Sequence, residues 1–225
     1  MTKRTVKVGL CGLGTVGQGV LALLVEGNAA ISARSAAHLV VTHIGTRTPR
    51  PEVDIGDAQD SRDVFAVARD PEVDVLIELI GGTTVAKELV IEALQQKQRV
   101  VAANRALVAD HGGERFALAE QQGVSLKYEA AVAGGIPIIE TVRASLAANE
   151  VTSVAGIING TGNFILTAMA SEGRAFDDVL QEAQRLGYAE ADPTFDVDGT
   201  DAAQKLVLLA SLAFGAAIPA DAPFK

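Results

Sequence analysis

The feature that most constrains the fold is a glycine cluster near the N-terminus, "GLGTVG" at residues 12–17. Gly12, Gly14 and Gly17 have G-x-G-x-x-G spacing, directly after the apolar run Val6–Cys11 and before a helical pattern near Gln18–Leu24. The first glycine permits a tight turn, the second lets the backbone approach a pyrophosphate, and the third allows close helix–strand packing. Alone the motif is a weak signal, but a strand before it and a helix after it favour dinucleotide binding over a merely structural turn.

The rest of the first half alternates short apolar runs with helical patterns. We expect strands at His38–Ile44, Val73–Ile80, Arg99–Ala103 and Ser125–Ala130, with helices at Ala86–Gln96 and Glu114–Gln122 and a solvated loop at Glu26–Arg34. Strands separated by helices of this length predict right-handed crossovers and a parallel, doubly wound sheet. The expected fold class is therefore α/β, with a Rossmann-type domain over residues 1–133.

The pattern changes from about Gly134 onward. Helices are expected at Ile136–Asn149, Gly162–Ser171, Asp177–Leu186 and Thr200–Phe214, with a strand at Val151–Asn159. This strand-poor half predicts a second, α+β domain over residues 134–225.

Composition narrows the range of partners. The net charge of −9 argues against nucleic-acid binding, because a phosphate backbone demands a basic face. The most apolar run, Leu206–Ile218, is too short for a membrane span and is expected to be a buried helix. We expect a soluble, cytoplasmic protein. Cys11 is expected to pack under the nucleotide rather than react, and His38, His43 and His111 to pack in strands or loops, because they are too scattered to form a cluster.

The residues after the second expected strand bear on cofactor choice. An acid there binds the ribose hydroxyls of NAD, whereas an arginine accommodates the 2′-phosphate of NADP. The sequence reads "IGTRTPRP", with Arg47 in place and no acid before Glu52. NADP is favoured, with NAD and a simple exposed loop cation at Arg47 left as alternatives.

An acidic block, "LGYAEADPTFDVDGTDAAQKL", spans Leu186 to Leu206. Asp201 and Lys205 are spaced i, i+4, so they share one face of the expected helix. Asp198 and Thr200 are placed to cap that helix; Asp192 is expected in a turn with Pro193, and Asp196 in solvent. The block is either a capped helix behind a solvated acidic loop or a pocket for a cationic substrate with a proton-transfer group beside it.

Five blocks together resemble the homoserine dehydrogenase family: "GLGTVGQGV", "AANRALVA", "EAAVAGGIPII", "NGTGNFIL" and the acidic block, in this order. The resemblance covers nearly the whole chain. It implies NAD(P)-dependent interconversion of L-homoserine and L-aspartate 4-semialdehyde, in threonine, methionine and isoleucine biosynthesis. It also implies a Rossmann domain joined to a substrate-binding and dimerisation domain, and a homodimer when the protein is complete.

The resemblance also implies roles for individual residues. Lys205 would handle the proton, and Glu190 and Asp201 would hold the substrate. Thr15, Val16, Gly82, Thr83 and Gly187 would contact the cofactor, in addition to Gly12, Gly14 and Gly17 of the glycine motif and to Arg47, which the sequence pattern itself favours. A monovalent cation, Na⁺ or K⁺, would be held by Glu129, Val132, Gly134 and Ile136, since oxygen ligands suit a hard cation.

The chain departs from the family pattern at two points. Arg105 stands where the family has a lysine; arginine keeps the charge but does not readily release a proton, so we assign it to cofactor binding. The chain also stops at "AAIPADAPFK", where family members continue, so a truncated protein is expected. Two alternatives to the dehydrogenase remain: another NAD(P)-dependent oxidoreductase with an amino-acid-like substrate, and a non-catalytic nucleotide-binding module.

Overall fold

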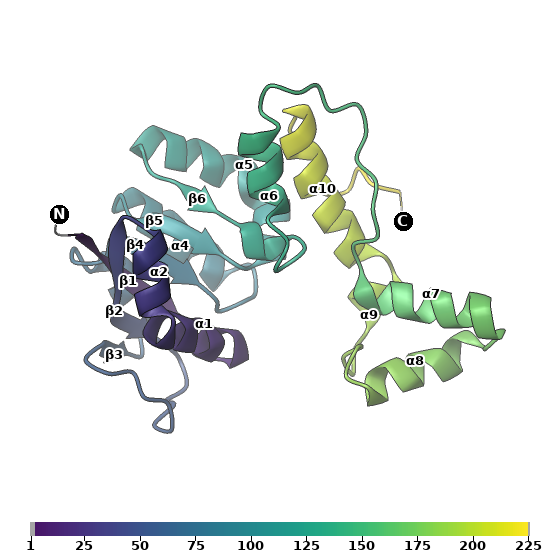
Figure 1. The fold of residues 1–225 in the computed structure, drawn as a ribbon, viewed down its shortest axis with the longest axis horizontal. Helices are drawn as coiled ribbons and strands as arrows, with labels where there is room; N and C mark the ends of the chain where they lie inside the picture. Colours follow the sequence, from purple (N-terminus) through teal and green to yellow (C-terminus); the bar gives the residue numbers. More distant parts are fainter. Residues whose placement is uncertain (1–2, 225) are drawn as a thin grey trace. The chain divides into compact units, whose positions relative to one another are not determined.

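The computed structural model describes residues 3–224, apart from the side chains of residues 106 and 109–112. The side chain of His111 therefore lies outside the described residues. The chain folds as two compact units, one ending at Ala131 and the other beginning at Val132 (Figure 1).

The first unit is built on a six-stranded sheet with the order β3-β2-β1-β4-β5-β6. Every neighbouring pair is parallel. The strands are β1 (Arg4–Cys11), β2 (Ala37–Gly45), β3 (Gln59–Ser61), β4 (Val75–Glu78), β5 (Arg99–Ala102) and β6 (Leu126–Lys127). Chain order reverses between β1 and β4, so the predicted doubly wound α/β sheet is confirmed.

Helices cover the sheet in two groups. Helices α1 (Thr15–Glu26) and α2 (Asn28–Arg34) contact each other and β2. Helices α3 (Val64–Arg69), α4 (Val85–Gln95) and α5 (Arg105–Gln122) contact one another in series. A short 3₁₀ helix, η1 (Glu129–Ala131), ends the unit. The apolar cluster beside α1 is formed by Leu10, Leu13, Leu21, Ile44 and Ala58.

Close packing explains one helix that the sequence analysis missed. A Cβ on Gly9 of β1 would lie 2.4 Å from Cγ1 of Val67, so the glycine lets α3 lie directly on the sheet. Asp63 caps α3 by accepting a hydrogen bond from the N–H of Phe65 at 2.9 Å.

The prediction of a solvated loop at Glu26–Arg34 was wrong, because α2 occupies most of this segment. None of the residues of α2 is buried, so the segment lacks the apolar stripe that would indicate a helix.

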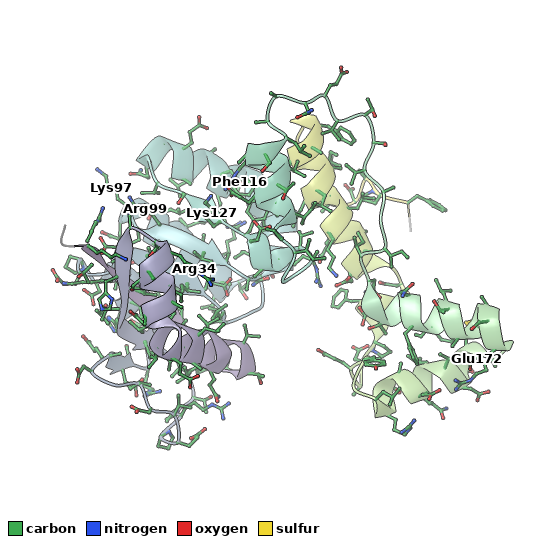
Figure 2. The ribbon with its side chains drawn as sticks, in the orientation of Figure 1. Arg34, Lys97, Arg99, Phe116, Lys127 and Glu172 are labelled. Carbon is green, nitrogen blue, oxygen red and sulfur yellow. The ribbon has the colours of Figure 1, made fainter. Side chains whose placement is uncertain are left out.

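The second unit is helical in the part that the structure describes. Its elements are α6 (Ile138–Glu140), the π-helix η2 (Thr141–Ser145), α7 (Gly160–Glu172), α8 (Phe176–Arg185), α9 (Thr194–Val197) and α10 (Thr200–Phe214). Helices α7 and α8 pack through Ile165, Ala168 and Val179. The buried face of α10 carries Asp201, Ala203, Val207, Leu208, Leu209 and Ala210. Glu172 lies at the end of α7 (Figure 2).

Two expected elements in this unit were wrong. The helix expected at Ile136–Asn149 ends at Ser145; Leu146 is 37% exposed, and residues 147–150 are exposed too, so no packed face supports further turns. The strand expected at Val151–Asn159 has no regular structure, and Ile157 is 79% exposed. A strand is defined by hydrogen bonds to a neighbour, and no described residue pairs with this segment.

Among the described residues, no single helix is long and apolar enough to cross a membrane; α1 and α2 meet the criteria of length and composition only as a pair, bent by 69°.

Candidate functional site

The glycine turn between β1 and α1 is tightly packed at two positions and open at the third. Gly12 has a φ of 104°, and a Cβ there would lie 2.7 Å from the carbonyl oxygen of Leu79. A Cβ on Gly17 would lie 2.0 Å from the carbonyl oxygen of Gly12. A Cβ on Gly14 would meet no atom within 4 Å. The first and third glycines therefore hold the turn, and the second borders open space.

The N-terminus of α1 is suited to an anion. No side chain caps it, its first turn carries no acid, and Thr15 and Val16 are exposed. A helix end in this state presents N–H groups and a partial positive charge. Together with the open space at Gly14, it fits the pyrophosphate of a dinucleotide.

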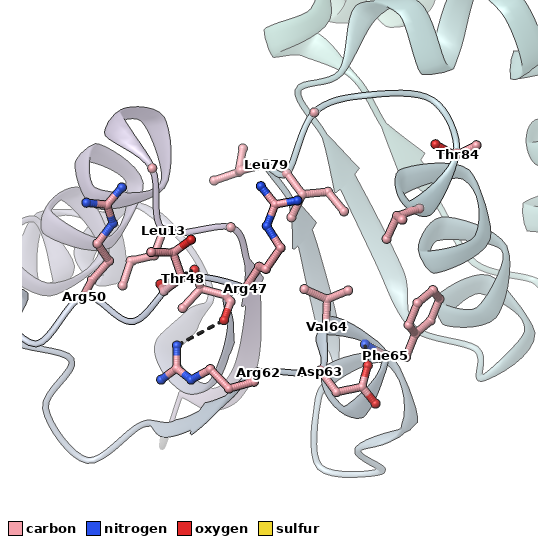
Figure 3. A pocket seen from close by; sticks show the side chains of 16 residues that line it. Leu13, Arg47, Thr48, Arg50, Arg62, Asp63, Val64, Phe65, Leu79 and Thr84 are labelled. Carbon is pink, nitrogen blue, oxygen red and sulfur yellow. Dashed lines mark hydrogen bonds between the residues drawn. The ribbon is translucent and has the colours of Figure 1, made fainter.

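A cavity of about 540 Å³ adjoins this turn at the end of β2. Arg47, Arg50 and Arg62 all line it, together with Thr46 and Thr48 (Figure 3). Arg62 donates to the carbonyl oxygen of Thr46 at 3.1 Å and pairs with Asp60. The cavity therefore brings together three guanidinium groups, of which the sequence analysis had singled out Arg47 alone.

The acid lining this cavity is already engaged. Asp63 caps α3, and its second carboxylate oxygen lies 3.8 Å from Arg69. The residues after β2 therefore offer guanidinium groups in the place where an NAD-binding domain usually offers a carboxylate to the ribose.

A second turn, after β4, carries the other predicted cofactor residues of this sheet edge. Gly81 and Gly82 have φ values of 70° and 73°, and Thr83 follows them on the surface. Asn104 donates from Nδ2 to the carbonyl oxygen of Gly82, and its Oδ1 accepts from the N–H of Leu107 at 3.2 Å. One side chain, Asn104, thus both caps α5 and holds the Gly82 turn. Arg105 follows it as the first residue of α5 and is half-buried.

In the second unit, Lys205 and Asp201 form a mostly buried ion pair. Lys205 Nζ lies 2.8 Å from Asp201 Oδ2, and their side chains are 15% and 8% exposed. Lys205 also donates to the carbonyl oxygen of Ile158 at 2.6 Å. Both residues line a cavity of about 720 Å³ with Thr161, Phe164 and Tyr188. The pair therefore lies at a cavity wall, and the capped-helix reading alone does not account for it.

Asn159 links this pair to a second carboxylate. Its Nδ2 donates to Asp201 Oδ2 at 2.9 Å and to Asp196 Oδ1 at 2.7 Å, while its Oδ1 caps α7. Asp196 lines the same cavity, so the expectation that it is simply solvated was wrong. Asn159 received no role from the sequence, although it opens the quoted block "NGTGNFIL"; a polar residue just before a helix was the available signal.

The remaining acids of the block lie elsewhere. Glu190 is exposed and does not line this cavity; its carbonyl oxygen accepts from Gln184 at 3.1 Å. Gly187, at a φ of 78°, forms the exposed turn before it. Asp192 accepts from the N–H of Thr194 at 3.2 Å, which confirms its predicted turn. Gly199 is the N-cap of α10, and Asp198 accepts from the N–H of Thr200 at 2.8 Å.

The residues predicted to hold a monovalent cation fall in both units. Glu129 lies in η1 of the first unit. Val132 is buried, whereas Gly134 and Ile136 are exposed; the carbonyl oxygen of Ile136 accepts from the N–H of Ile138 at 2.8 Å. In the described part of the chain, no three His, Cys, Asp or Glu side chains gather where they would hold a metal. The four-residue set stays a prediction.

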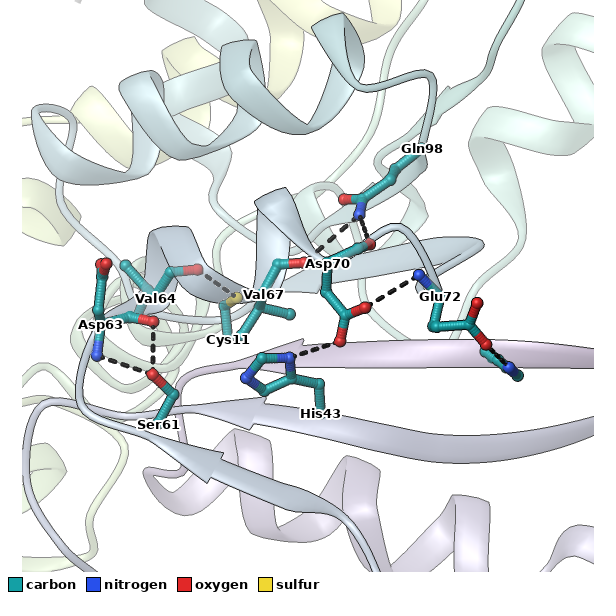
Figure 4. A network of polar contacts seen from close by, with 10 residues as sticks. Cys11, His43, Ser61, Asp63, Val64, Val67, Asp70, Glu72 and Gln98 are labelled. Atoms are coloured by element: carbon teal, nitrogen blue, oxygen red, sulfur yellow. Dashed lines mark hydrogen bonds and ion pairs between the residues drawn. The ribbon is translucent and has the colours of Figure 1, made fainter.

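A separate polar network in the first unit is structural (Figure 4). His43 is 2% exposed and its Nδ1 lies 2.8 Å from Asp70 Oδ2. Burial raises the pKa of Asp70. The hydrogen bonds from the N–H of Glu72 and from His43 together lower it by more than burial raises it, so the pKa of Asp70 lies below its usual range. Cys11 is buried, and burial raises its pKa well above that of a free thiol, so it stays protonated and unreactive.

The parallel sheet, its glycine turn and the uncapped helix end define an α/β protein of the dinucleotide-binding class. The family model described as "Homoserine dehydrogenase, NAD binding domain" matches residues 12–129, and the model described as "Homoserine dehydrogenase" matches residues 137–222. The chain belongs to the homoserine dehydrogenase family, which confirms the resemblance inferred from the sequence.

Individual relatives agree with this assignment. A homoserine dehydrogenase of Pseudomonas aeruginosa is 54% identical over 218 residues, which cover 97% of this chain and 50% of the relative. The crystal structure of a homoserine dehydrogenase from Thiobacillus denitrificans is 50% identical with a TM-score of 0.90, covering 97% of this chain and 51% of that one. A hyperthermophilic archaeal homoserine dehydrogenase in complex with NADPH, 24% identical, shares the fold with a TM-score of 0.80, covering 94% and 70% of the two chains. The chain spans about half the length of the curated relatives it matches.

Proposed function

We propose that this protein interconverts L-homoserine and L-aspartate 4-semialdehyde, with NADP as the hydride carrier. The observation that carries the proposal is the Asp201–Lys205 pair at the wall of a cavity, in the unit that the homoserine dehydrogenase model covers. A carboxylate and an ammonium side by side match a substrate that carries an ammonium and a reacting hydroxyl.

The chemistry assigns a task to each group. When bound, the cofactor would supply the nicotinamide ring that accepts the hydride in the oxidation of homoserine at its hydroxyl-bearing carbon. The hydroxyl proton then passes to Lys205 in its neutral form, and the aldehyde results. In the reverse direction, protonated Lys205 returns the proton to the developing alkoxide. Asp201 holds Lys205 in position and pairs with the substrate ammonium, whereas Glu190 does not line this cavity and no substrate contact is proposed for it.

The glycine turn and its neighbours serve the cofactor. Gly12 and Gly17 shape the turn, and Gly14, Thr15 and Val16 border the pyrophosphate. Further contacts are proposed from Arg47, Gly82, Thr83, Arg105 and Gly187. The proposal has three further parts. A Na⁺ or K⁺ ion is bound by Glu129, Val132, Gly134 and Ile136, the complete protein is a homodimer, and its location is cytoplasmic.

The test measures homoserine-dependent reduction of NADP⁺ through the absorbance of the reduced nicotinamide. It is carried out with this chain and with a form extended to the length of its relatives. Replacing Lys205 by methionine removes the proton acceptor, so kcat should fall by roughly 10²- to 10⁴-fold while the affinity for NADPH stays unchanged. Lys97→Met is the matched control, because Lys97 lies in the exposed turn before β5 (Figure 2). Near-normal kcat in Lys205→Met would remove Lys205 from the mechanism, and absence of turnover in both wild-type forms would favour a nucleotide-binding module.

The preference for NADP rests on the arginines of the 540 Å³ cavity. Arg47→Ser should weaken NADPH binding by about 10- to 150-fold, the value of a hydrogen bond to a charged group, and leave NADH binding unchanged. Calorimetric titration with both nucleotides measures this. Arg99→Ser is the control, since Arg99 is also exposed but begins β5, at the opposite end of the strands (Figure 2). An equal loss for both nucleotides would assign Arg47 to the pyrophosphate, and no loss would leave it an exposed loop cation.

A further inference from the structure

Glu78, the last residue of β4, is a completely buried carboxylate at the edge of the sheet where the strands end. Its Oε1 accepts hydrogen bonds from the N–H groups of Ile80 at 2.9 Å and Gly81 at 3.3 Å. These bonds hold the start of the Gly81–Gly82 turn, which Asn104 holds from the other side. One oxygen of Glu78 therefore positions the turn.

The second oxygen of the same carboxylate has no partner. Glu78 Oε2 is buried and accepts no hydrogen bond from any described residue. Burial raises the pKa of Glu78, while the two backbone N–H groups lower it, with a net rise. A buried polar atom without a partner costs free energy, and a ligand that donated a hydrogen bond to it would remove this cost.

Glu78 lines a cavity of about 190 Å³ that offers room for one. The other lining residues are Val16, Leu79, Gly81, Ala103 and Asn104. Val16 belongs to the first turn of α1, and Ala103 and Asn104 follow β5. The cavity thus lies between the glycine turn and the end of β5.

This position decides which part of a dinucleotide the cavity can receive. The dinucleotide lies across the carboxyl ends of the strands at the point where strand order reverses, with the pyrophosphate at the first helix. The arginine cavity extends from the residues after β2 to the turn after β4, and its arginines, which all follow β2, suit the adenosine half with its 2′-phosphate. The Glu78 cavity follows β4 and β5, on the other side of β1, so it faces the nicotinamide half.

We infer that Glu78 is a cofactor ligand whose Oε2 accepts a hydrogen bond from the nicotinamide half, from a ribose hydroxyl or the carboxamide N–H, while its Oε1 positions the Gly81–Gly82 turn. The inference rests on the proposed cofactor, and it adds an acceptor that neither the glycine motif nor the acidic block contains.

Glu78→Gln tests it, because the amide oxygen can still accept from Ile80 and Gly81, whereas the amide nitrogen cannot accept from a ligand. Affinity is measured by calorimetry for NADPH, for 2′-phospho-ADP-ribose, which lacks only the nicotinamide, and for adenosine 2′,5′-bisphosphate, which lacks the whole nicotinamide half. The variant should bind NADPH roughly 10- to 100-fold more weakly and the bisphosphate as well as wild type. An equal loss for NADPH and phospho-ADP-ribose identifies a ribose hydroxyl as the donor, and a loss for NADPH alone identifies the carboxamide.

Asp70→Asn is the matched control, since it also turns a carboxylate into an amide but alters the His43 pair, neither residue of which lines the cavity. It should lower the midpoint of thermal unfolding and leave all three affinities unchanged. If Glu78→Gln does not fold, Glu78→Asp, which withdraws the carboxylate by one methylene, should give the same selective loss. If a folded variant binds NADPH as wild type does, or loses as much affinity for the bisphosphate as for NADPH, the inference about Glu78 is overturned while the proposed cofactor stands. A wild-type chain that binds none of the three would overturn the proposed cofactor as well.

Discussion

Gly17→Ala should strongly weaken cofactor binding and destabilise the first unit. The new Cβ would lie 2.0 Å from the carbonyl oxygen of Gly12, and backbone atoms cannot give way as a flexible side chain can. The turn and the start of α1 must move apart, with an expected loss of about 3 kcal/mol in the free energy of unfolding, at the upper end for an overpacked site. The displaced helix end would also lose its place beside the pyrophosphate, so NADPH affinity should fall by roughly 100-fold or more.

Gly14→Ala separates the two effects. Gly14 has a φ of −75°, which alanine adopts freely, and its Cβ would meet nothing within 4 Å. The protein should keep its stability within about 1 kcal/mol and lose at least tenfold in NADPH affinity, because the methyl group occupies the space open to the phosphates. Gly19→Ala, in the exposed middle of α1, is the control and should raise stability by up to about 1 kcal/mol without touching binding. Normal NADPH binding in both Gly14→Ala and Gly17→Ala would show that this turn holds no nucleotide.

Asp201→Ala should destabilise the second unit by about 3 kcal/mol. It leaves the mostly buried ammonium of Lys205 without its carboxylate and removes an acceptor of Asn159. Replacing both partners, as Asp201→Leu with Lys205→Met, should recover most of this loss, since an apolar pair needs no compensation. The coupling energy of the pair is the change in the double variant minus the sum of the changes in the single variants Asp201→Leu and Lys205→Met.

The measurement must report on the second unit, because the two compact units need not unfold together. Hydrogen exchange of the backbone amides of α7 and α10 serves this purpose, since exchange through unfolding reports the local free energy. Asp178→Ala, an exposed acid in the first turn of α8, is the control and should change protection in these helices by no more than about 0.5 kcal/mol. Protection of α10 that is unchanged in Asp201→Ala would mean that the pair contributes nothing to stability.

Much of the first unit was predictable because its signals are local in the chain. Five of the six strands begin within three residues of their predicted starts, since buried strands in a parallel sheet are continuous apolar runs. The exception is β3, Gln59–Ser61, which has polar residues and only three positions, too few for a periodicity to emerge. The strand expected at Val151–Asn159 failed for the opposite reason: its composition favours a strand, but pairing depends on a neighbour that composition does not reveal.

The acidic block shows the same limit at the level of single side chains. The i, i+4 spacing correctly joined Asp201 to Lys205, because helix geometry alone brings these positions together. The spacing did not reveal Asn159, which reaches Asp196 and Asp201 from 37 and 42 residues away along the chain. The family resemblance grouped Glu190 with Asp201 as a substrate-binding residue, whereas the Glu190 side chain is exposed and does not line their cavity.

The sequence by itself determined the doubly wound sheet, the glycine turn and the family, because periodicity and short motifs are written in consecutive residues. Only the tertiary structure decided which acids share a cavity with Lys205, which arginines gather after β2, and that Glu78 is a buried carboxylate with one oxygen unpartnered among the described residues. The physical reason is distance along the chain: these arrangements join residues on separate strands, helices and turns, and only packing of the whole unit fixes where those elements meet.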